Sequence, residues 1–379
     1  MKKDNRNACA VKTSIGGQAL MEGIMMRGPK KTAMAVWNTK GEMIVEEIEP
    51  KATNRPGICK WPLVRGIFGF IDSMALGYKC LMRSAEISGL DDIVEENPKK
   101  KKKREEKEAK AAAERAENAA ETVASADAVA DASQEPAEPA QPENGDKKEE
   151  EEKLPAWVMT LTMVASVVIA VALAIGLFFY LPSKLYELLA RFVPFFRGEN
   201  AALNSLWKSL FEGIFKILLL VGYMAAISLM KDIRRTFMYH GAEHKTIFCY
   251  EAGLELTVEN VRRQKRFHPR CGTSFLILML LVSMFISFLI DPLSIAIGGK
   301  VLQTGWRTLV RLLLFPLVMG IGYELIKFAG RHDNLFTRII SAPGVWLQHL
   351  TVFEPDDRMI ECAITAVKRV IPEDGSDNW

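Results

Sequence analysis

Histidine and cysteine are scarce in this chain of 379 residues, which contains five histidines and six cysteines. The cysteines form no C-x-x-C pair, so no disulfide framework is expected and reduced, cytosolic thiols are favoured. An excess of one charge sign is also lacking, because 49 basic residues face 46 acidic ones, and nothing in this balance favours nucleic acid. The first residues, MKKDNRNACAVKTSIGG, have no apolar stretch behind their lysines, so no cleavable signal peptide is expected.

The average composition, 49% hydrophobic, hides two extreme kinds of segment. Residues 95–153 are almost entirely charged residues, alanine and proline. Such a segment buries almost no apolar surface, so we expect a disordered, solvated insert without chemistry.

Four later windows are long and apolar enough to cross a bilayer, which takes about 20 residues. They predict four transmembrane helices: Trp157–Leu181, Trp207–Met230, Thr273–Ile290 and Leu309–Ala329. Lysine and arginine in the connecting segments predict their orientation. Segment 231–272 holds nine such residues, against three in 182–206 and one in 291–306. We therefore expect a multi-pass membrane protein, with both termini and segment 231–272 in the cytoplasm.

The window 61–81 is apolar but ambiguous. Its charged residues Arg65, Asp72 and Lys79 recur every seven positions, which makes one narrow polar stripe on a helix. A helix on the membrane surface, a helix packed on the bundle and a re-entrant segment all fit this pattern. A fifth span fits less well, because charged side chains are costly in the bilayer.

The N-terminal residues predict a small β-rich unit. KTAMAVWN and GEMIVEEIE alternate like strands around the turn NTKG, which is typical of a hairpin. The preceding stretch IGGQALMEGIMMRGP is rich in glycine, and from spacing alone we favour one bulged strand with turn residues at its ends.

The C-terminal tail predicts a capped amphipathic helix after Pro355. Acidic residues stand at its start and basic residues near its end, as the helix dipole favours. Its predicted buried face comprises Met359, Ile360, Ala363, Ile364, Val367 and Val370.

Three of the five histidines fall in segment 231–272, together with Cys271. His240 and His244 lie one helical turn apart in HGAEH, the spacing with which two histidines bind zinc. HGAEH also fits H-x-x-E-H, the inverted zinc-protease motif, in which the glutamate, here Glu243, acts as general base. HPRC adds His268 and Cys271 at the spacing of a chelating turn stiffened by a proline.

Glu251 is a competing ligand, since it returns to the helical face of His240 eleven residues later. A straight helix places it roughly 10 Å from His244, so it ranks below His268 and Cys271. If all four of those ligands bind, the site is closed and structural, whereas three ligands leave a position for water.

The basic run RRQKRFHPR at 262–270 has two interpretations. It is a positive-inside signal that faces lipid phosphates, or it contacts an RNA-rich particle such as a ribosome. Aromatic residues are too few among these charges to favour single-stranded nucleic acid.

Four long motifs together resemble the YqhQ-like bacterial membrane proteins: GGQALMEGIMMRGP, YHGAEHKTIFCYEAG, HPRCGTSF and WLQHLTVFEPDDRMIECAI. The resemblance covers the chain except for the insert 95–153. Members of this family are described as predicted metal-dependent enzymes without an assigned function. The resemblance also raises Glu22 and Arg27 as candidate site residues, since EGIMMRGP resembles a family signature.

We therefore predict an α-helical polytopic membrane protein, with about four transmembrane helices and a small N-terminal β-rich cytoplasmic unit. The resemblance implies that the membrane is a bacterial inner membrane. The expected parts are 1–57 (β-rich), 58–94 (membrane-associated helical), 95–153 (insert), 154–329 (four spans) and 330–379 (tail).

The expected function is that of a metal-dependent hydrolase, with zinc as the first candidate cofactor. Its substrate would be a membrane-embedded peptide or lipid, and Arg270 would stabilise developing negative charge. The alternative is a non-enzymatic factor with a structural metal that binds the ribosome or the insertion machinery. A transporter is less favoured, because Asp291 and Glu324 lie near span ends.

Overall fold

The computed structural model describes residues 12–49, 56–89, 156–196, 201–300, 302–332 and 334–377. They belong to two compact units, one made of 1–91 with 172–379 and the other of 92–171. Of the second unit only 156–171 is described, and the predicted insert 95–153 lies outside the described residues. The predicted boundaries between the parts of the chain stay predictions.

A four-stranded antiparallel sheet forms the N-terminal part. Its strands β1 (Gly16–Leu20), β2 (Gly23–Arg27), β3 (Thr32–Trp37) and β4 (Met43–Ile48) lie side by side in chain order. The predicted hairpin is confirmed as β3 and β4, with Trp37 opposite Met43. The prediction of one bulged strand before it is wrong, because β1 and β2 form a second hairpin that turns at Met21 and Glu22. Glu22 has a φ of 50°, which glycine or asparagine would ordinarily supply.

Helices cover both faces of this sheet, because its side chains alternate between two apolar surfaces. On one face Met25, Met34 and Val36 pack against α1 (Val64–Ile87), chiefly around Cys80. On the other face Ile24, Met26, Ala33 and Ala35 pack against α7 (Lys231–Glu251) and α12 (Asp357–Val370).

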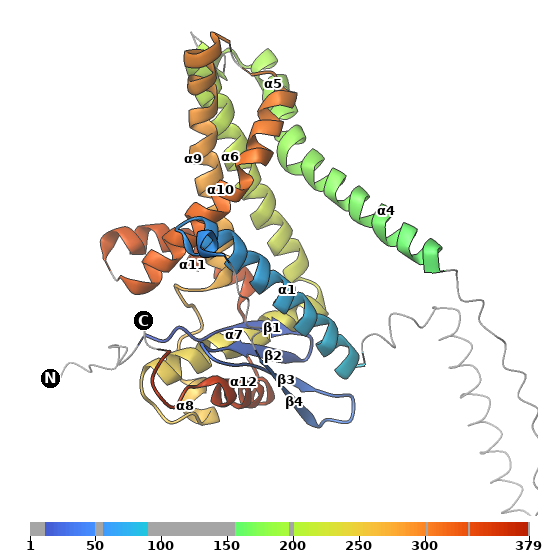
Figure 1. Cartoon of the computed structure of the whole chain (residues 1–379), viewed down its shortest axis with the longest axis vertical. Coiled ribbons are helices and arrows are strands. Elements are labelled where there is room, and N and C mark those ends of the chain that lie inside the picture. Colours follow the sequence, from blue (N-terminus) through green and yellow to red (C-terminus); the bar gives the residue numbers. More distant parts are fainter. Residues whose placement is uncertain are drawn as a thin grey trace, which may run out of the picture. The chain divides into compact units, whose positions relative to one another are not determined.

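Helix α12 buries all six residues that helical spacing assigns to its apolar face. The carboxylate of Asp356 caps its first turn by accepting a hydrogen bond from the backbone N–H of Met359, at 2.9 Å. The predicted amphipathic helix is therefore confirmed, and it lies against the sheet and α7 (Figure 1).

Within the described ranges, four helical stretches are long and apolar enough to cross a membrane: Val164–Phe192, Leu203–Ser228, Gly272–Gly298 and Thr304–Arg331. The first combines α4 (Ala156–Ile175), the short π-helix η2 (Gly176–Tyr180) and α5 (Leu181–Phe192), so it continues beyond the expected end at Leu181. The others lie in α6 (Ala201–Ser228), α9 (Gly272–Gly298) and α10 (Thr304–Arg331), which pack together. Large apolar side chains such as Leu313 and Ile297 point outward from them, which is typical of helices that face lipid.

Helix α1 contains most of the ambiguous window 61–81, and it is not one of the four apolar stretches found among the described residues. It packs against both the sheet and α10. The guanidinium of Arg65 donates two hydrogen bonds to the carboxylate of Glu324, at 2.6 and 2.5 Å. The polar stripe of α1 thus provides a link to α10.

Three elements complete the part that surrounds α7. They are α8 (Val258–Arg262), α11 (Leu335–Thr351) and a segment that links α11 to α12. The ends of the described chain also meet here, because Ser14 donates its backbone N–H to the carbonyl of Asp377, at 2.6 Å.

The packing of α12 makes a stability prediction. Ile360 has no exposed surface, so Ile360→Ala should lower the free energy of unfolding by about 2–5 kcal/mol. Thermal melting of the purified full chain would show this as a lower Tm. Glu361→Ala, on the exposed face of the same helix, should leave Tm almost unchanged. Equal melting of the two variants would contradict the buried position of Ile360.

Candidate metal centre

Helix α7 presents His240 and His244 from one face, one turn apart, and their ring centroids lie 4.4 Å from each other. The residue between them that allows this position is Gly241. A Cβ atom there would lie 2.0 Å from the carbonyl oxygen of Phe353, in the segment that leads to α12. Only glycine therefore lets that segment cross α7 directly behind the two imidazoles.

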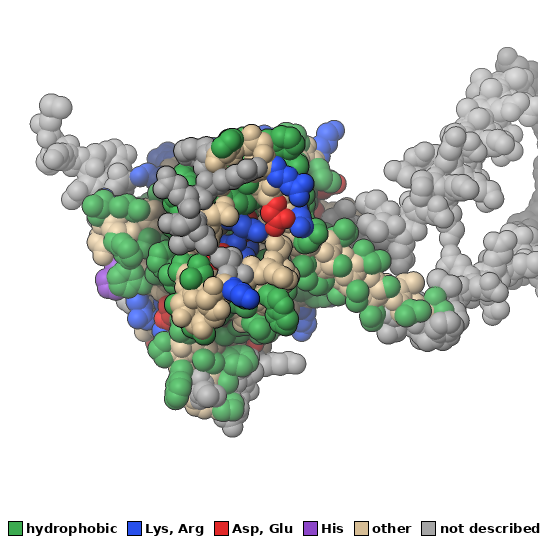
Figure 2. Space-filling model, turned by 90° about the horizontal axis from the view of Figure 1, so that it is seen from above, with side chains coloured by type: hydrophobic (Ala, Val, Ile, Leu, Met, Phe, Trp, Pro, Cys, Tyr) green, Lys and Arg blue, Asp and Glu red, His purple; other side chains and the backbone are tan. Residues whose placement is uncertain are grey.

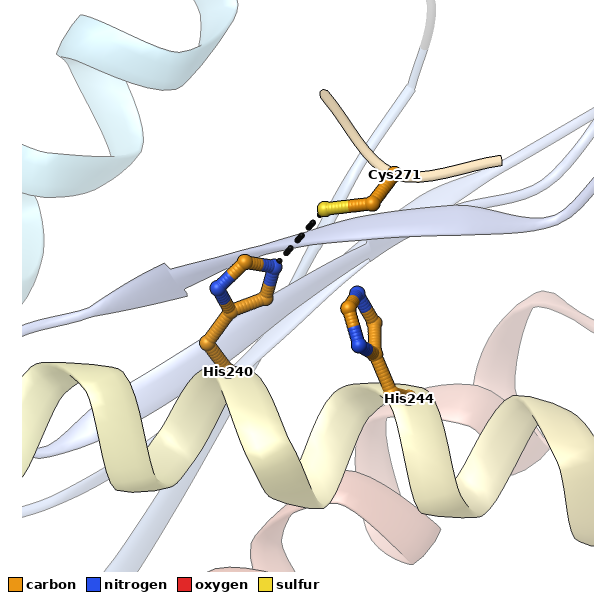
Figure 3. Close-up of side chains that lie close together, drawn as sticks. All are labelled: His240, His244 and Cys271. Atoms are coloured by element: carbon orange, nitrogen blue, oxygen red, sulfur yellow. Dashed lines mark hydrogen bonds between the residues drawn. The ribbon is translucent and has the colours of Figure 1, made fainter. Parts of the chain in front are cut away.

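Cys271 comes from a different element, since it is the N-cap residue of α9. Its Sγ lies 3.1 Å from Nε2 of His240 (Figure 3). One ligand atom from each of His240, His244 and Cys271 lies within 4.8 Å of the others, which is a spacing that one metal ion can bridge. We call these residues the His–His–Cys trio.

Hydrogen bonds fix which nitrogen each imidazole offers. Nδ1 of His240 lies 2.9 Å from the carbonyl oxygen of Thr351, and Nδ1 of His244 lies 2.6 Å from that of Arg266. A carbonyl can only accept, so both Nδ1 atoms carry hydrogen and each Nε2 is left to bind another group. Metal-binding histidines are usually held in this way. Nε2 of His244 is buried and has no hydrogen-bond partner.

The charges of the trio are strongly coupled. Burial opposes the charged forms, yet the Cys271 thiolate raises the pKa of His240 to about 9. Burial alone would raise the pKa of the Cys271 thiol, but the imidazoles of His240 and His244 lower it well below its ordinary value. The thiolate form that metals bind is therefore favoured, and a divalent cation at this place would replace the shared proton.

Glu243 is buried beside the trio, and its two carboxylate oxygens differ. Oε1 accepts a hydrogen bond from the backbone N–H of Gly17 at 3.0 Å, whereas Oε2 is buried without a partner. A Cβ at Gly17 would meet the Glu243 carboxylate at 3.0 Å and the carbonyl of Met25 at 2.7 Å, so glycine permits this approach of β1. Burial raises the pKa of the Glu243 carboxyl, and the charges of His240 and His244 partly oppose this.

His268 is buried but does not belong to the trio. Its Nε2 faces Oε2 of Glu251, at 3.6 Å. Gln348 holds the backbone of His268 on both sides, because it accepts from its N–H at 2.8 Å and donates to its carbonyl at 2.7 Å. The HPRC turn is therefore fixed so that Cys271 reaches the two histidines of α7, while the imidazole of His268 faces Glu251.

Glu251 and Arg270 form a second buried group beside His268. Arg270 donates a hydrogen bond to the Glu251 carboxylate and another to the carbonyl of Thr13, the latter at 3.3 Å. Although burial acts in the opposite direction, hydrogen bonding with His268 and the charge of Arg270 lower the pKa of Glu251 to about 2. The hydrogen bonds found for the Arg270 guanidinium go to Glu251, Thr13 and His268, and none of them goes to the trio.

Glu22 and Arg27, the candidates raised by the family resemblance, line two different cavities. Glu22 binds Arg235 and accepts a hydrogen bond from the Tyr239 hydroxyl at 3.1 Å, in a cavity of about 220 Å³. Arg27 donates to the Ser73 hydroxyl at 3.2 Å in a cavity of about 480 Å³. Gly17, which holds Glu243, also lines the larger cavity.

Sequence reasoning missed three residues that position the site, namely Gly17, Gln348 and Thr351. Two of them act through backbone atoms, which side-chain patterns do not reveal. Gln348 acts through its side chain, but its burial in α11, which makes a hydrogen-bonding role necessary, is visible only in the structure.

The donor set suits a metal of the zinc type. Two imidazole nitrogens and a thiolate are common zinc ligands, and three protein ligands leave one position open. Nε2 of His244 is also buried without a hydrogen-bond partner, which is rare for a buried polar atom unless it binds a ligand. The residues therefore fit a bound divalent metal.

Together these features define a helical protein whose described part has four helices apolar enough to cross a membrane. Its His–His–Cys group joins α7 to the start of one of them, α9. The chain belongs to the family described as "Protein of unknown function (DUF1385)", which matches residues 61–373. It is also 30% identical over 365 residues to the uncharacterized protein YqhQ of Bacillus subtilis (strain 168). This alignment covers 95% of this chain and 93% of that protein. The YqhQ-like resemblance is thus confirmed. No solved structure matches the chain.

The geometry makes a prediction about metal content. The purified full chain should contain about one zinc per chain. His244→Ala should lose at least about 90% of it, because it removes one of three ligands, and loss of even an outer partner of a ligand costs about 10–100-fold in affinity. His268→Gln should retain the metal, since its imidazole lies outside the trio. Elemental analysis of the purified variants measures both. Loss of zinc in His268→Gln, with Tm unchanged, would instead show His268 to be a ligand.

Proposed function

We propose that this protein is a metal-dependent hydrolase that acts at the cytoplasmic surface of the membrane. One observation carries the proposal. Three metal-ligand atoms converge in a buried place, and beside them the Glu243 carboxylate has one oxygen held by Gly17 and the other without a partner. A structural zinc site would need a fourth protein ligand, but among the described residues only three converge.

A divalent metal held by the trio would supply Lewis acidity, polarising a carbonyl or phosphoryl oxygen and acidifying water. Glu243 would then act as the base. Its Oε2 takes a proton from the attacking water as the oxygen forms a bond to the substrate, and it returns that proton to the leaving group as the scissile bond breaks. A carboxyl whose pKa is raised by burial suits this task, since a base works best with a pKa near the working pH.

The place of the trio in the chain supports a substrate drawn from the membrane. Cys271 directly precedes α9, and α7 follows α6 after two residues, so both elements of the trio adjoin apolar helices. The excess of lysine and arginine in 231–272 supports a cytoplasmic position of this side under the positive-inside rule. A membrane-embedded peptide or a lipid fits such a site.

The contact between His240 and Cys271 also fits a second kind of hydrolase. A thiolate 3.1 Å from an imidazole, at the N-terminus of a long helix, has the geometry of a cysteine nucleophile and its base. The metal has the stronger support, because a dyad leaves Nε2 of His244 without a role. Chelation separates the two, since only a metal enzyme loses activity with a chelator and regains it with zinc.

A non-enzymatic factor that binds a ribosome or insertion machinery would need free positive charge on segment 262–270. Much of that charge is already paired. Arg262 binds Asp357 at 2.5 Å, Arg266 binds Glu354 at 3.4 Å, and Arg263 binds Glu259. We therefore rank this function below the hydrolase.

Replacing the base provides the test of the hydrolase. Glu243→Gln is nearly isosteric and should retain zinc, but turnover should fall by about 10²–10⁴-fold, because proton transfer is lost. In a deletion strain this variant should fail to restore the wild-type phenotype and the wild-type membrane lipid and peptide profile, as measured by mass spectrometry. Glu361→Gln, exposed on α12, is the matched control and should complement.

Full complementation by Glu243→Gln, with zinc bound, would exclude Glu243 as the base and leave the metal a structural role. Failure of both Glu243→Gln and His244→Ala, with zinc absent from the latter alone, would support the hydrolase.

A further inference from the structure

The bundle of apolar helices contains a second polar cluster, well separated from the trio along the chain. Five ionisable side chains that are at most 7% exposed lie between its helices. They are Glu212 and Lys216 on α6, Asp291 on α9, and Arg307 and Arg311 on α10. We call this set the bundle cluster. Asp291 follows Cys271 by 20 residues, or about 30 Å along α9.

The cluster contains two ion pairs. Arg307 lies 3.0 Å from Asp291 through Nη1 and donates from Nη2 to the Ser209 hydroxyl at 2.7 Å. Arg311 lies 2.5 Å from Glu212, whose other oxygen accepts a hydrogen bond from Ser183 at 2.5 Å. Each carboxylate therefore already has one guanidinium as its partner.

The charges do not balance, because three cations face two carboxylates. Lys216 is the remaining cation. Its ammonium lies 4.8 Å from the centre of the Phe179 ring, and among the described residues no carboxylate forms an ion pair with it. Nη2 of Arg311 and Oε2 of Glu212 face each other in the ion pair. Apart from these two atoms, Nε of Arg307 and Nε of Arg311 are buried without hydrogen-bond partners, against one such acceptor, Oδ1 of Asp291. The cluster thus has spare donors and one spare positive charge.

An unbalanced charge inside an apolar bundle is costly, and such groups usually mark a functional site. An anion beside Lys216 and the two guanidiniums would remove the imbalance and accept the spare hydrogen bonds. Arginine forks and a lysine ammonium together are typical of phosphate recognition.

A polar route leads from the cluster to the end of the bundle. On α6 the polar residues Ser205, Ser209, Glu212 and Lys216 repeat at intervals of three or four and so share one face. Lys208 lies on α6 between Ser205 and Ser209, 3.3 Å from Glu187, which also accepts a hydrogen bond from Thr304. Figure 2, seen from above relative to Figure 1, shows basic side chains around an acidic one in the middle of this end.

We propose that the bundle cluster binds a phosphate group between α5, α6, α9 and α10. The group belongs either to the head of an anionic lipid or to free inorganic phosphate. The proposal does not depend on hydrolysis at the trio, because the two sets of residues share no member.

The test uses the purified full chain and two probes. Sodium phosphate, compared with sodium chloride at equal ionic strength, probes the free anion in detergent. Nanodiscs of phosphatidylglycerol, compared with phosphatidylcholine, probe the lipid head. One of the two should raise the Tm of the wild type by about 2–4 °C, the shift expected from roughly 1 kcal/mol of binding free energy.

Lys216→Met should abolish this rise while both ion pairs remain, and Lys184→Met, an exposed lysine of α5 paired with Glu187, should retain it. A rise with one probe alone identifies the source. If neither probe raises the Tm of the wild type, or if the Tm of Lys216→Met rises equally, the proposal is overturned. If Lys216→Met does not fold, Lys216→Gln replaces it, and the wild-type comparison is decisive by itself.

Discussion

Two hydrogen bonds determine the chemistry of the α7 face. In each, Nδ1 of His240 or His244 donates to a backbone carbonyl, so that both Nε2 atoms are left to bind another group. Without them either nitrogen of each imidazole could carry the hydrogen, and Cys271 would face a mixture of protonated and unprotonated nitrogens. With them, three ligand atoms converge before any metal arrives, so little ordering remains for binding to accomplish.

Segments far apart in the chain supply these constraints. The two carbonyls belong to the end of α11 and to the loop before HPRC, and the Glu243 carboxylate depends on β1. The sheet and α12 hold α7 from behind, where Gly241 permits close approach. The site is thus a product of the whole folded unit, and a change in the N-terminal strands can alter it as readily as a change in α7.

Local spacing predicted the parts of the site that depend on one helix turn. HGAEH indicated the shared face of His240 and His244, and the apolar windows indicated the four long helices. Spacing could not place His268, because its direction depends on Gln348 from α11. Nor could it reveal that charges near span ends pair across helices. Asp291 stands in the sequence as a charge near the end of a span, and in the fold it binds Arg307. Pairing between segments is a tertiary property that one sequence does not display.

The coordination shell of the bound metal tests the account most directly. X-ray absorption at the zinc edge of the purified protein should show one sulfur at about 2.3 Å and nitrogen or oxygen neighbours at about 2.0 Å. The multiple scattering should correspond to two imidazoles, with a light atom in the fourth position, and His268→Gln should give the same spectrum. A shell with three imidazoles and one sulfur, or one without sulfur, would contradict a three-ligand site made by His240, His244 and Cys271.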